Sequence, residues 1–248
     1  MSSPSGAEPE TMAKGFFITG TDTGVGKTVI STAVVRLLHC SGITAGAMKP
    51  VETGCEKAGD LLIPHDATLL KRAARMDEPA SLVAPCCYES PLSPLAASEA
   101  DDCKLPDIAK IMAAFWELSA AYEVMVVEGA GGLMVPIRRD YSMTDLAAEL
   151  GLALIVVSRP GLGALNHTLL TIGHAADRGL KVAGIVINYS RPPENSLAEK
   201  TNPGLLARLT PVPVIGIFPY LEDIHEEIIE QEALKRLALD EIRNYCGH

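Results

Sequence analysis

Six short runs of apolar and β-branched residues recur along the chain. They cover residues 16–19, 43–48, 123–127, 152–158, 182–188 and 212–218. Runs that are apolar almost throughout, rather than at every second position, are typical of strands buried on both faces of a parallel sheet. The pattern therefore predicts six buried strands.

Segments with helical periodicity lie between these runs, the clearest being 28–38, 107–121 and 164–178. Near the end of the chain, residues 222–245 predict a further helix with one apolar stripe, formed by Ile224, Ile228, Leu234, Leu237 and Ile242. Strand and helix alternate, as in an α/β fold. We expect one α/β domain over residues 15–248, built on a mostly parallel sheet with helices on both faces.

Two segments depart from this alternation. Residues 1–14 are small, polar and acidic, without the apolar core of a secretory signal, and predict a disordered extension in which Met12 is an alternative start. Residues 79–106 contain five prolines and no sustained helical period. So long an irregular segment is uncommon in a compact domain, and a lid, an excursion from the domain or a packed irregular loop would explain it.

Charge and composition narrow the possible partners. The 248 residues include 21 Lys and Arg against 31 Asp and Glu, which gives a formal net charge of −10. Because nucleic acids and anionic membrane surfaces recruit clustered basic charge, neither is expected as a partner. No apolar stretch reaches the roughly 20 residues of a transmembrane helix. The six cysteines form no CxxC pair, which favours a reducing cytoplasm.

The first predicted strand runs directly into a glycine-rich loop, GTDTGVGKT at residues 20–28, and the loop runs into a predicted helix. Backbone N–H groups of such a loop surround phosphates, Lys27 reaches the terminal phosphates, and the Thr28 hydroxyl suits magnesium. Five residues separate Gly20 from Gly26, where the usual motif has four, so this is a lengthened variant.

Lengthened loops of this kind occur in partition and septum-positioning ATPases, which form the alternative functional class. Many of those ATPases carry a second lysine five positions before the loop lysine. This chain has Asp22 there, which argues against that class.

Charged residues follow two more predicted strands, namely Lys49 after the second and Glu128 after the third. Because the carboxyl ends of parallel strands meet at one edge, both should face the phosphate loop. Glu128 is then a candidate magnesium ligand. Asp66, in a short polar turn, is either a helix cap or a further ligand. The glycines after Glu128 should leave room for a ligand.

Four stretches together resemble the dethiobiotin synthetase family: GTDTGVGKT, MKPVETG at 48–54, HDA at 65–67 and VEGAGG at 127–132. The similarity continues through 163–167, 186–188 and 216–221. It implies a P-loop NTPase-like fold and an ATP- and Mg²⁺-dependent ligase that carboxylates 7,8-diaminononanoate with CO₂ and closes the ring of dethiobiotin. It also implies a homodimer with the substrate near the subunit interface.

The resemblance assigns roles by position. The expected ATP-binding residues are Gly24, Val25, Gly26, Lys27, Thr28, Val29, Asp66, Glu128, Gly129, Ala130, Gly131, Asn188, Tyr189, Pro219, Tyr220 and Leu221. The expected substrate-binding residues are Thr23, Lys49, Thr53, Gly131, Gly163, Ala164, Leu165 and Asn166. The metal ligands would be Thr28, Asp66 and Glu128, and the catalytic residues Lys49 and Lys27.

Two of these implied roles also have a physical rationale. The Asn188 amide, with a donor and an acceptor, suits adenine. Unpaired N–H groups at a helix start near 163–166 would favour a substrate carboxylate, and by resemblance this segment reaches the substrate from the neighbouring subunit. A related amide-forming ligase of cobalamin synthesis would usually add a glutaminase domain, for which a chain ending at His248 has no room.

Overall fold

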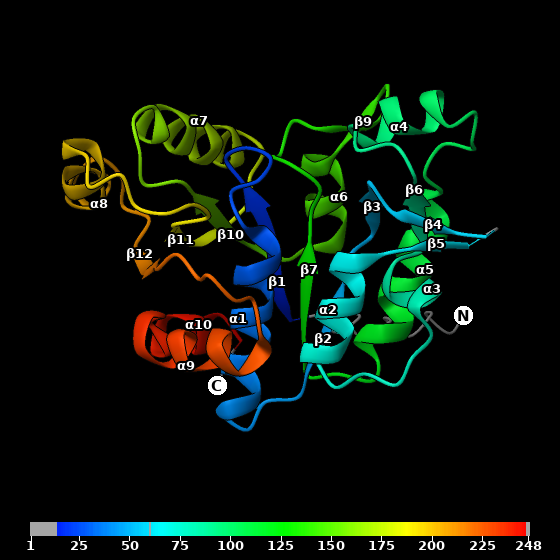
Figure 1. The fold of residues 1–248 in the computed structure, drawn as a ribbon, viewed down its shortest axis with the longest axis horizontal. Helices are drawn as coiled ribbons and strands as arrows, with labels where there is room; N and C mark the ends of the chain where they lie inside the picture. Colours follow the sequence, from blue (N-terminus) through cyan, green and yellow to red (C-terminus); the bar gives the residue numbers. More distant parts are fainter. Residues whose placement is uncertain (1–13, 60, 247–248) are drawn as a thin grey trace, which may run out of the picture.

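The computed structural model describes residues 14–59 and 61–246. Its centre is a six-stranded parallel sheet in the order β12-β11-β10-β1-β7-β2 (Figure 1). The strands are β1 (Gly15–Gly20), β2 (Ala45–Met48), β7 (Val124–Glu128), β10 (Ala153–Ser158), β11 (Val182–Asn188) and β12 (Val214–Phe218). The predicted parallel sheet is confirmed, and each strand begins within two residues of its predicted start.

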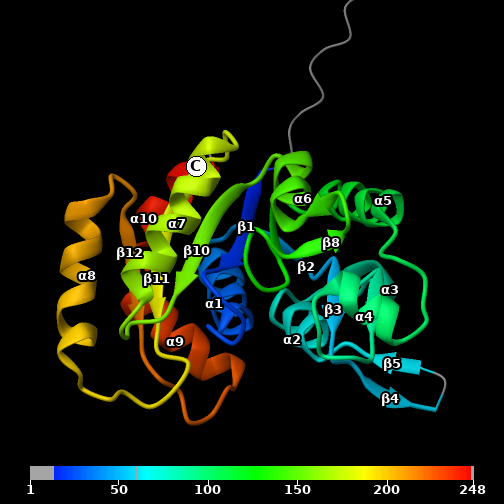
Figure 2. The same ribbon diagram turned by 90° about the horizontal axis from the view of Figure 1, so that it is seen from above.

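Helices cover both faces of this sheet, as predicted. Figure 2 shows α1 (Lys27–Cys40) and α9 (Glu226–Arg236) on one side and α5 (Ile108–Ser119), α6 (Met143–Leu150) and α7 (Ala164–Asp177) on the other. Neighbouring side chains of a strand point to opposite faces, and Phe16 and Phe17 in β1 are both fully buried. The core therefore lies on both sides of the sheet.

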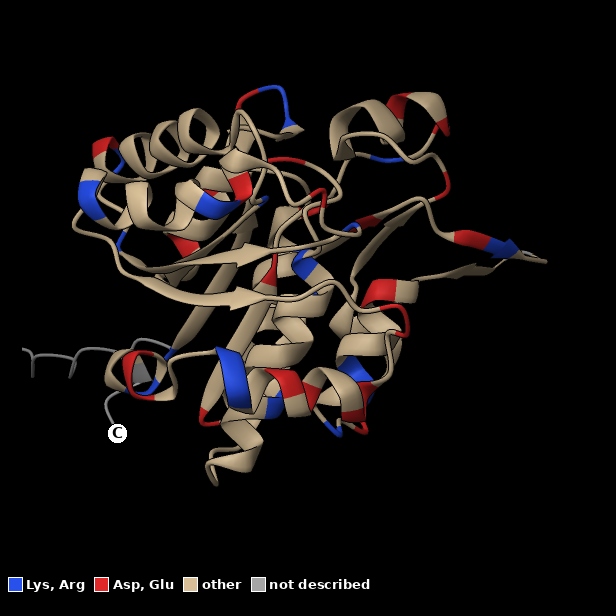
Figure 3. Cartoon of the chain, turned by 60° about the vertical axis from the view of Figure 1, so that its left-hand side comes forward, with Lys and Arg blue, Asp and Glu red and all other residues tan. Residues whose placement is uncertain are grey.

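The outer helices are joined by ion pairs. Arg36 of α1 pairs with Glu230 of α9, and Arg72 of α2 (His65–Ala73) pairs with Glu226 of α9. Figure 3 shows lysines and arginines dispersed among acidic residues over many elements. The remaining long helix, α8 (Leu197–Leu209), flanks the β12 edge of the sheet.

The proline-containing segment 79–106 is more regular than its sequence indicated. It holds α3 (Ala80–Val83), β6 (Cys86–Tyr88) and α4 (Pro94–Ala100), and β6 pairs with β3 (Val51–Thr53). The expectation of an irregular stretch was wrong because these elements are too short to show a period. Pro94 begins α4, a position where its missing N–H costs nothing. Tertiary packing therefore holds the segment in place.

The end of the chain differs from the prediction of one striped helix. It forms α9 and α10 (Leu239–Cys246), separated at Leu237, which bridges to Gly216 of β12. A Cβ on Gly216 would lie 2.6 Å from the Leu237 side chain, so only glycine allows this approach. Ile224, Ile228 and Leu234 are exposed, and the buried side chains are Ile229, Ala233, Leu237 and Ile242. Ile224 precedes α9, and α9 buries Ile229 and Ala233 instead of Ile228 and Leu234, so the predicted stripe is wrong for three of its five residues.

Two hairpins complete the described elements: β4 (Glu56–Ala58) with β5 (Leu61–Ile63), and β8 (Pro136–Arg138) with β9 (Tyr141–Ser142). Within residues 14–59 and 61–246, no helix has the length and apolar character needed to cross a membrane. The predicted disordered extension, residues 1–14, lies outside the described residues except for Lys14.

Candidate active site

A pocket of about 550 Å³ opens where the carboxyl ends of several strands meet the start of α1. It brings together most of the residues expected from the sequence: Thr23, Gly24, Gly26, Lys27, Thr28, Val29, Lys49, Thr53, Asp66, Glu128, Ala130, Gly131, Asn188, Tyr189, Pro219, Tyr220 and Leu221. These residues come from distant parts of the chain. Parallel pairing of their strands places them at one edge of the sheet.

The glycine-rich loop is shaped by two left-handed glycines, Gly24 (φ 71°) and Gly26 (φ 87°). A Cβ on Gly26 would lie 2.1 Å from Nδ2 of Asn188, so a larger residue would collide with that side chain. Among the described residues, no side chain caps the first turn of α1. Its N–H groups are therefore available to phosphate oxygens, to which the helix dipole adds attraction.

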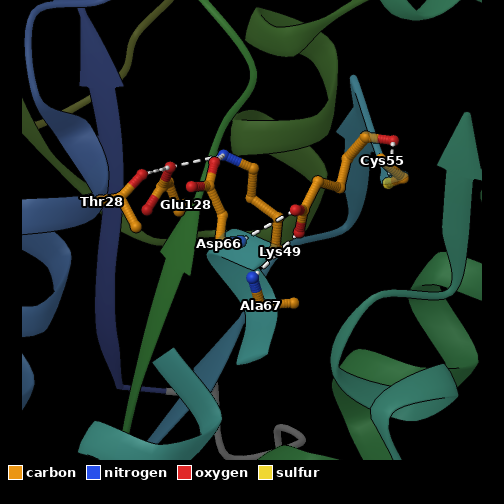
Figure 4. Close-up of polar contacts among 7 residues, drawn as sticks. Thr28, Lys49, Cys55, Asp66, Ala67 and Glu128 are labelled. Carbon is orange, nitrogen blue, oxygen red and sulfur yellow. Dashed lines mark hydrogen bonds and ion pairs between the residues drawn. The ribbon is translucent and has the colours of Figure 1, made fainter. Parts of the chain in front are cut away.

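Three charged side chains meet beside this loop. The register pairs Met48 with Val127, so Lys49 emerges at the level of Glu128. Lys49 Nζ lies 2.5 Å from Oε1 of Glu128 and 2.9 Å from Oδ2 of Asp66 (Figure 4). The Thr28 hydroxyl donates to the same Glu128 oxygen at 3.0 Å. Lys49 and Glu128 are 5% and 1% exposed, so this ion pair is screened little by water.

Burial and neighbouring charges set the protonation of these groups. Burial by itself would lower the pKa of Lys49, but Glu128 and Asp66 outweigh it and raise that pKa above the ordinary lysine value. Burial by itself would raise the pKa of Asp66, but Lys49 lowers it below the usual carboxyl value. Burial lowers the pKa of Lys27, and Glu128 only partly offsets this. Lys49 therefore keeps its positive charge at neutral pH.

The same cluster suits a magnesium ion. Oε2 of Glu128 is buried and has no hydrogen-bond partner in the part of the chain that the structure describes. A buried carboxylate oxygen without a donor is costly unless a cation meets it. Thr28, Asp66 and Glu128 offer oxygen ligands, and Mg²⁺ commonly takes one or two carboxylates together with phosphate oxygens and water. The residues present fit magnesium bound together with a nucleotide.

Two of the expected ATP-binding residues lie behind the pocket wall. Val25 is fully buried, and its carbonyl accepts a hydrogen bond from Nδ2 of Asn188 at 2.8 Å. Gly129 leaves room for a neighbouring ring rather than for a ligand, because a Cβ there would lie 2.8 Å from the Phe17 ring. Both residues therefore support the pocket from behind.

The expected substrate residues Gly163, Ala164, Leu165 and Asn166 also lie outside the pocket lining. They form the start of α7, where Gly163 adopts φ 89° and no side chain caps the helix. The preceding Leu162 is 98% exposed. The Ala164 N–H donates to the Gly161 carbonyl at 3.2 Å, and in the described part of the chain no side chain caps the first turn of α7.

Sequence reasoning missed four residues that line the pocket, namely Val51, Ser190, Glu222 and Ile224. Ser190 directly follows Asn188-Tyr189, and Glu222 directly follows Leu221. Extending each expected segment by one residue would have found both. Val51 lies two residues from both Lys49 and Thr53, which is the spacing of one strand face. No sequence signal marks Ile224.

The chain is similar to known proteins over most of its length. A family model described as an AAA domain matches residues 14–228. The chain is 42% identical to an ATP-dependent dethiobiotin synthetase of Thermodesulfovibrio yellowstonii, over 92% of this chain and 98% of the relative. It is 34% identical to the enzyme of that name from Bacillus subtilis, over 94% of this chain and 99% of the relative.

Among solved structures, the chain resembles the MinC:MinD cell division protein complex of Aquifex aeolicus. The TM-score is 0.56, the identity 16%, and the match covers 95% of this chain and 96% of that one. At this identity the likeness shows the shared fold alone. It confirms the P-loop NTPase-like architecture.

Proposed function

The chain belongs to the family of ATP-dependent dethiobiotin synthetases, and we propose that the pocket residues described above have separate roles in that reaction. The protein is a ligase of biotin biosynthesis. One amine of 7,8-diaminononanoate adds to CO₂ to give a carbamate, whose oxygen attacks the γ-phosphate of ATP and displaces ADP. The second amine then attacks the mixed anhydride, which closes the ring and releases phosphate.

The observation that carries this assignment is the meeting of Lys49, Glu128 and Asp66 beside the phosphate loop. Lys27 and the uncapped start of α1 would hold the ATP phosphates. Lys49, which stays charged, would stabilise the negative charge shared by the attacking carbamate and the transferring phosphoryl group. Phosphoryl transfer depends chiefly on such positioning and charge stabilisation.

Thr28, Asp66 and Glu128 would hold magnesium. The ion would neutralise charge on the phosphates when bound. In the structure Lys49 pairs with both carboxylates, so the lysine and the ion would share them. This sharing would keep Lys49 close to the terminal phosphate.

Adenine would lie at the far end of the pocket, beside Asn188, Tyr189, Pro219, Tyr220 and Leu221. One N–H of the Asn188 amide donates a hydrogen bond to the Val25 carbonyl. Its second N–H and its oxygen are the donor and acceptor that adenine would engage.

The diamine would lie near Thr23, Thr53 and Gly131, which line the same pocket. Residues 163–166 lie outside that lining, so a neighbouring subunit would have to supply them to the substrate carboxylate. This supports a homodimer with composite sites. Five described cysteines are free thiols, in keeping with the proposed cytoplasmic location.

Omitting each substrate in turn tests the reaction. ATP turnover should require both the diamine and bicarbonate, and the product should contain the ureido ring. Turnover that continues unchanged without the diamine would contradict this function. Mixing Lys49→Gln with Asn166→Ala protein tests the composite site, because heterodimers would regain one intact site. No recovery of activity would contradict the proposed arrangement.

The alternative, a septum-positioning type of switch, finds support only at the level of the fold. At the position where many such ATPases have lysine, Asp22 forms an ion pair with Arg159 of the same chain at 2.6 Å. An acidic residue held in this way offers no cation to another subunit.

A further inference from the structure

Glu52, in β3, was not expected as a site residue. Glu52 is 4% exposed, and its carboxylate accepts two backbone hydrogen bonds. Oε1 accepts from the N–H of Asp66 at 2.8 Å, and Oε2 accepts from the N–H of Ala67 at 2.9 Å. Both of its oxygens are therefore used at the start of α2.

Helix α2 has no cap of its own. The residue at its N-cap position is Pro64, which has no side-chain acceptor. The N–H groups of Asp66 and Ala67, in the first turn of α2, are those that a Ser or Asp at that position would satisfy. Glu52 provides this cap from another strand, and its negative charge also suits the positive end of the helix.

The segment from Lys49 to Glu52 holds Asp66 at two points. Glu52 holds its backbone N–H, and Lys49 Nζ holds its Oδ2 at 2.9 Å. We propose that Glu52 is a positioning residue that fixes the Asp66 carboxylate in the nucleotide site. This inference rests on the proposed role of Asp66 as a magnesium ligand.

A direct chemical role for Glu52 is not supported by the geometry. Glu52 does not line the pocket, and both of its oxygens face backbone N–H groups. It acts through Asp66, as carboxylates behind metal ligands often do. Loss of such a supporting partner typically lowers metal affinity by about 10- to 100-fold.

The test measures the magnesium requirement of ATP turnover in Glu52→Ala, Glu52→Gln, Asp66→Asn and the Glu52→Ala/Asp66→Asn double variant. Glu52→Ala should raise the half-saturating magnesium concentration by about tenfold. Glu52→Gln, which keeps one acceptor, should fall between Glu52→Ala and the parent. In the Asp66→Asn background, Glu52→Ala should add less than about twofold, because the residue through which it acts has lost its charge.

Two further readouts do not depend on activity. Nucleotide binding measured by calorimetry in EDTA should match the parent in Glu52→Ala. Amide hydrogen exchange at Asp66 and Ala67 should accelerate, since their N–H groups lose their acceptor. Asp101→Asn is the matched control, because Asp101 also accepts two backbone N–H groups, those of Glu89 and Ser90, but lies outside the pocket. It should keep the parental magnesium requirement.

The possible failures are distinguishable. If Asp66→Asn shifts the magnesium requirement and neither Glu52 variant does, the positioning role is wrong while the metal role of Asp66 stands. Equal effects of Glu52→Ala in both backgrounds would also overturn it. If Asp66→Asn leaves the requirement unchanged, the metal role of Asp66 and this inference both fail. Glu52→Gln keeps the test decisive if Glu52→Ala does not fold.

Discussion

Lys49 and Glu128 form a buried ion pair in which Nζ and Oε1 are 2.5 Å apart and the carboxylate is 1% exposed. Removing one partner of a buried pair leaves the other charge uncompensated, at a cost of about 3–5 kcal/mol. The two residues are therefore linked in stability as well as in the proposed chemistry. Experiments on either residue must therefore measure stability as well as activity.

Lys49→Gln should lower kcat by about 10²–10³, because it removes a preorganised charge that acts in the transition state. ATP affinity should change much less. Calorimetry and steady-state kinetics would separate the two effects. The double variant Lys49→Gln/Glu128→Gln removes both charges, so it should recover stability without recovering turnover. Near-parental kcat in Lys49→Gln would rule out the catalytic role.

Lys27→Gln should weaken nucleotide binding itself, since this lysine belongs to the phosphate loop and would contact phosphates in the ground state. We expect a clear rise in the Kd for ATP alongside the loss of kcat. Direct binding measurements on Lys27→Gln and Lys49→Gln under the same conditions provide the comparison. Equal ATP affinities in the two variants would contradict the division of roles.

Glu128→Gln and Thr28→Val should each raise the magnesium concentration needed for ATP use, because each removes an oxygen ligand. Titration of magnesium at fixed ATP measures this. Circular dichroism would show whether the fold is retained. A parental magnesium dependence in Glu128→Gln would exclude Glu128 as a ligand.

Asn188→Ala should reduce the preference for ATP over GTP, because the amide provides the donor and acceptor that adenine would engage. The variant also loses the 2.8 Å bond to the Val25 carbonyl, at a cost of about 1 kcal/mol in stability. Competition between the two nucleotides measures the preference, and thermal unfolding measures the stability. Equal use of ATP and GTP by the parent would exclude this role for Asn188.

Gly129→Ala should destabilise the fold by about 1–3 kcal/mol, because the added methyl group meets the buried Phe17 ring at 2.8 Å. Urea unfolding measures the change. Pairing it with Phe17→Leu, which makes space beside the methyl group, should recover part of the loss. If the stability losses of the two substitutions simply add, contact with the Phe17 ring is not the cause of the destabilisation.

Local sequence determined the strands and the phosphate loop of this protein. The apolar runs at 16–19 and 182–188 predicted β1 and β11, because a buried parallel strand needs apolar residues on both faces whatever its neighbours are. The loop at 20–28 could also be identified from the sequence, because its glycines and Lys27 lie within one short stretch. Parallel strands also placed Lys49 and Glu128 at one edge before any distance was known.

Tertiary structure decided everything that depends on contact between distant segments. The C-terminal helix is interrupted at Leu237, which bridges to Gly216 of β12. Position 129 requires glycine because the Phe17 ring packs against it. The cap that Glu52 places on α2 joins residues 14 positions apart. The periodicity of apolar residues along the sequence does not reveal such pairings, because a side chain's partner is set by the packing of whole elements and not by its sequence neighbours.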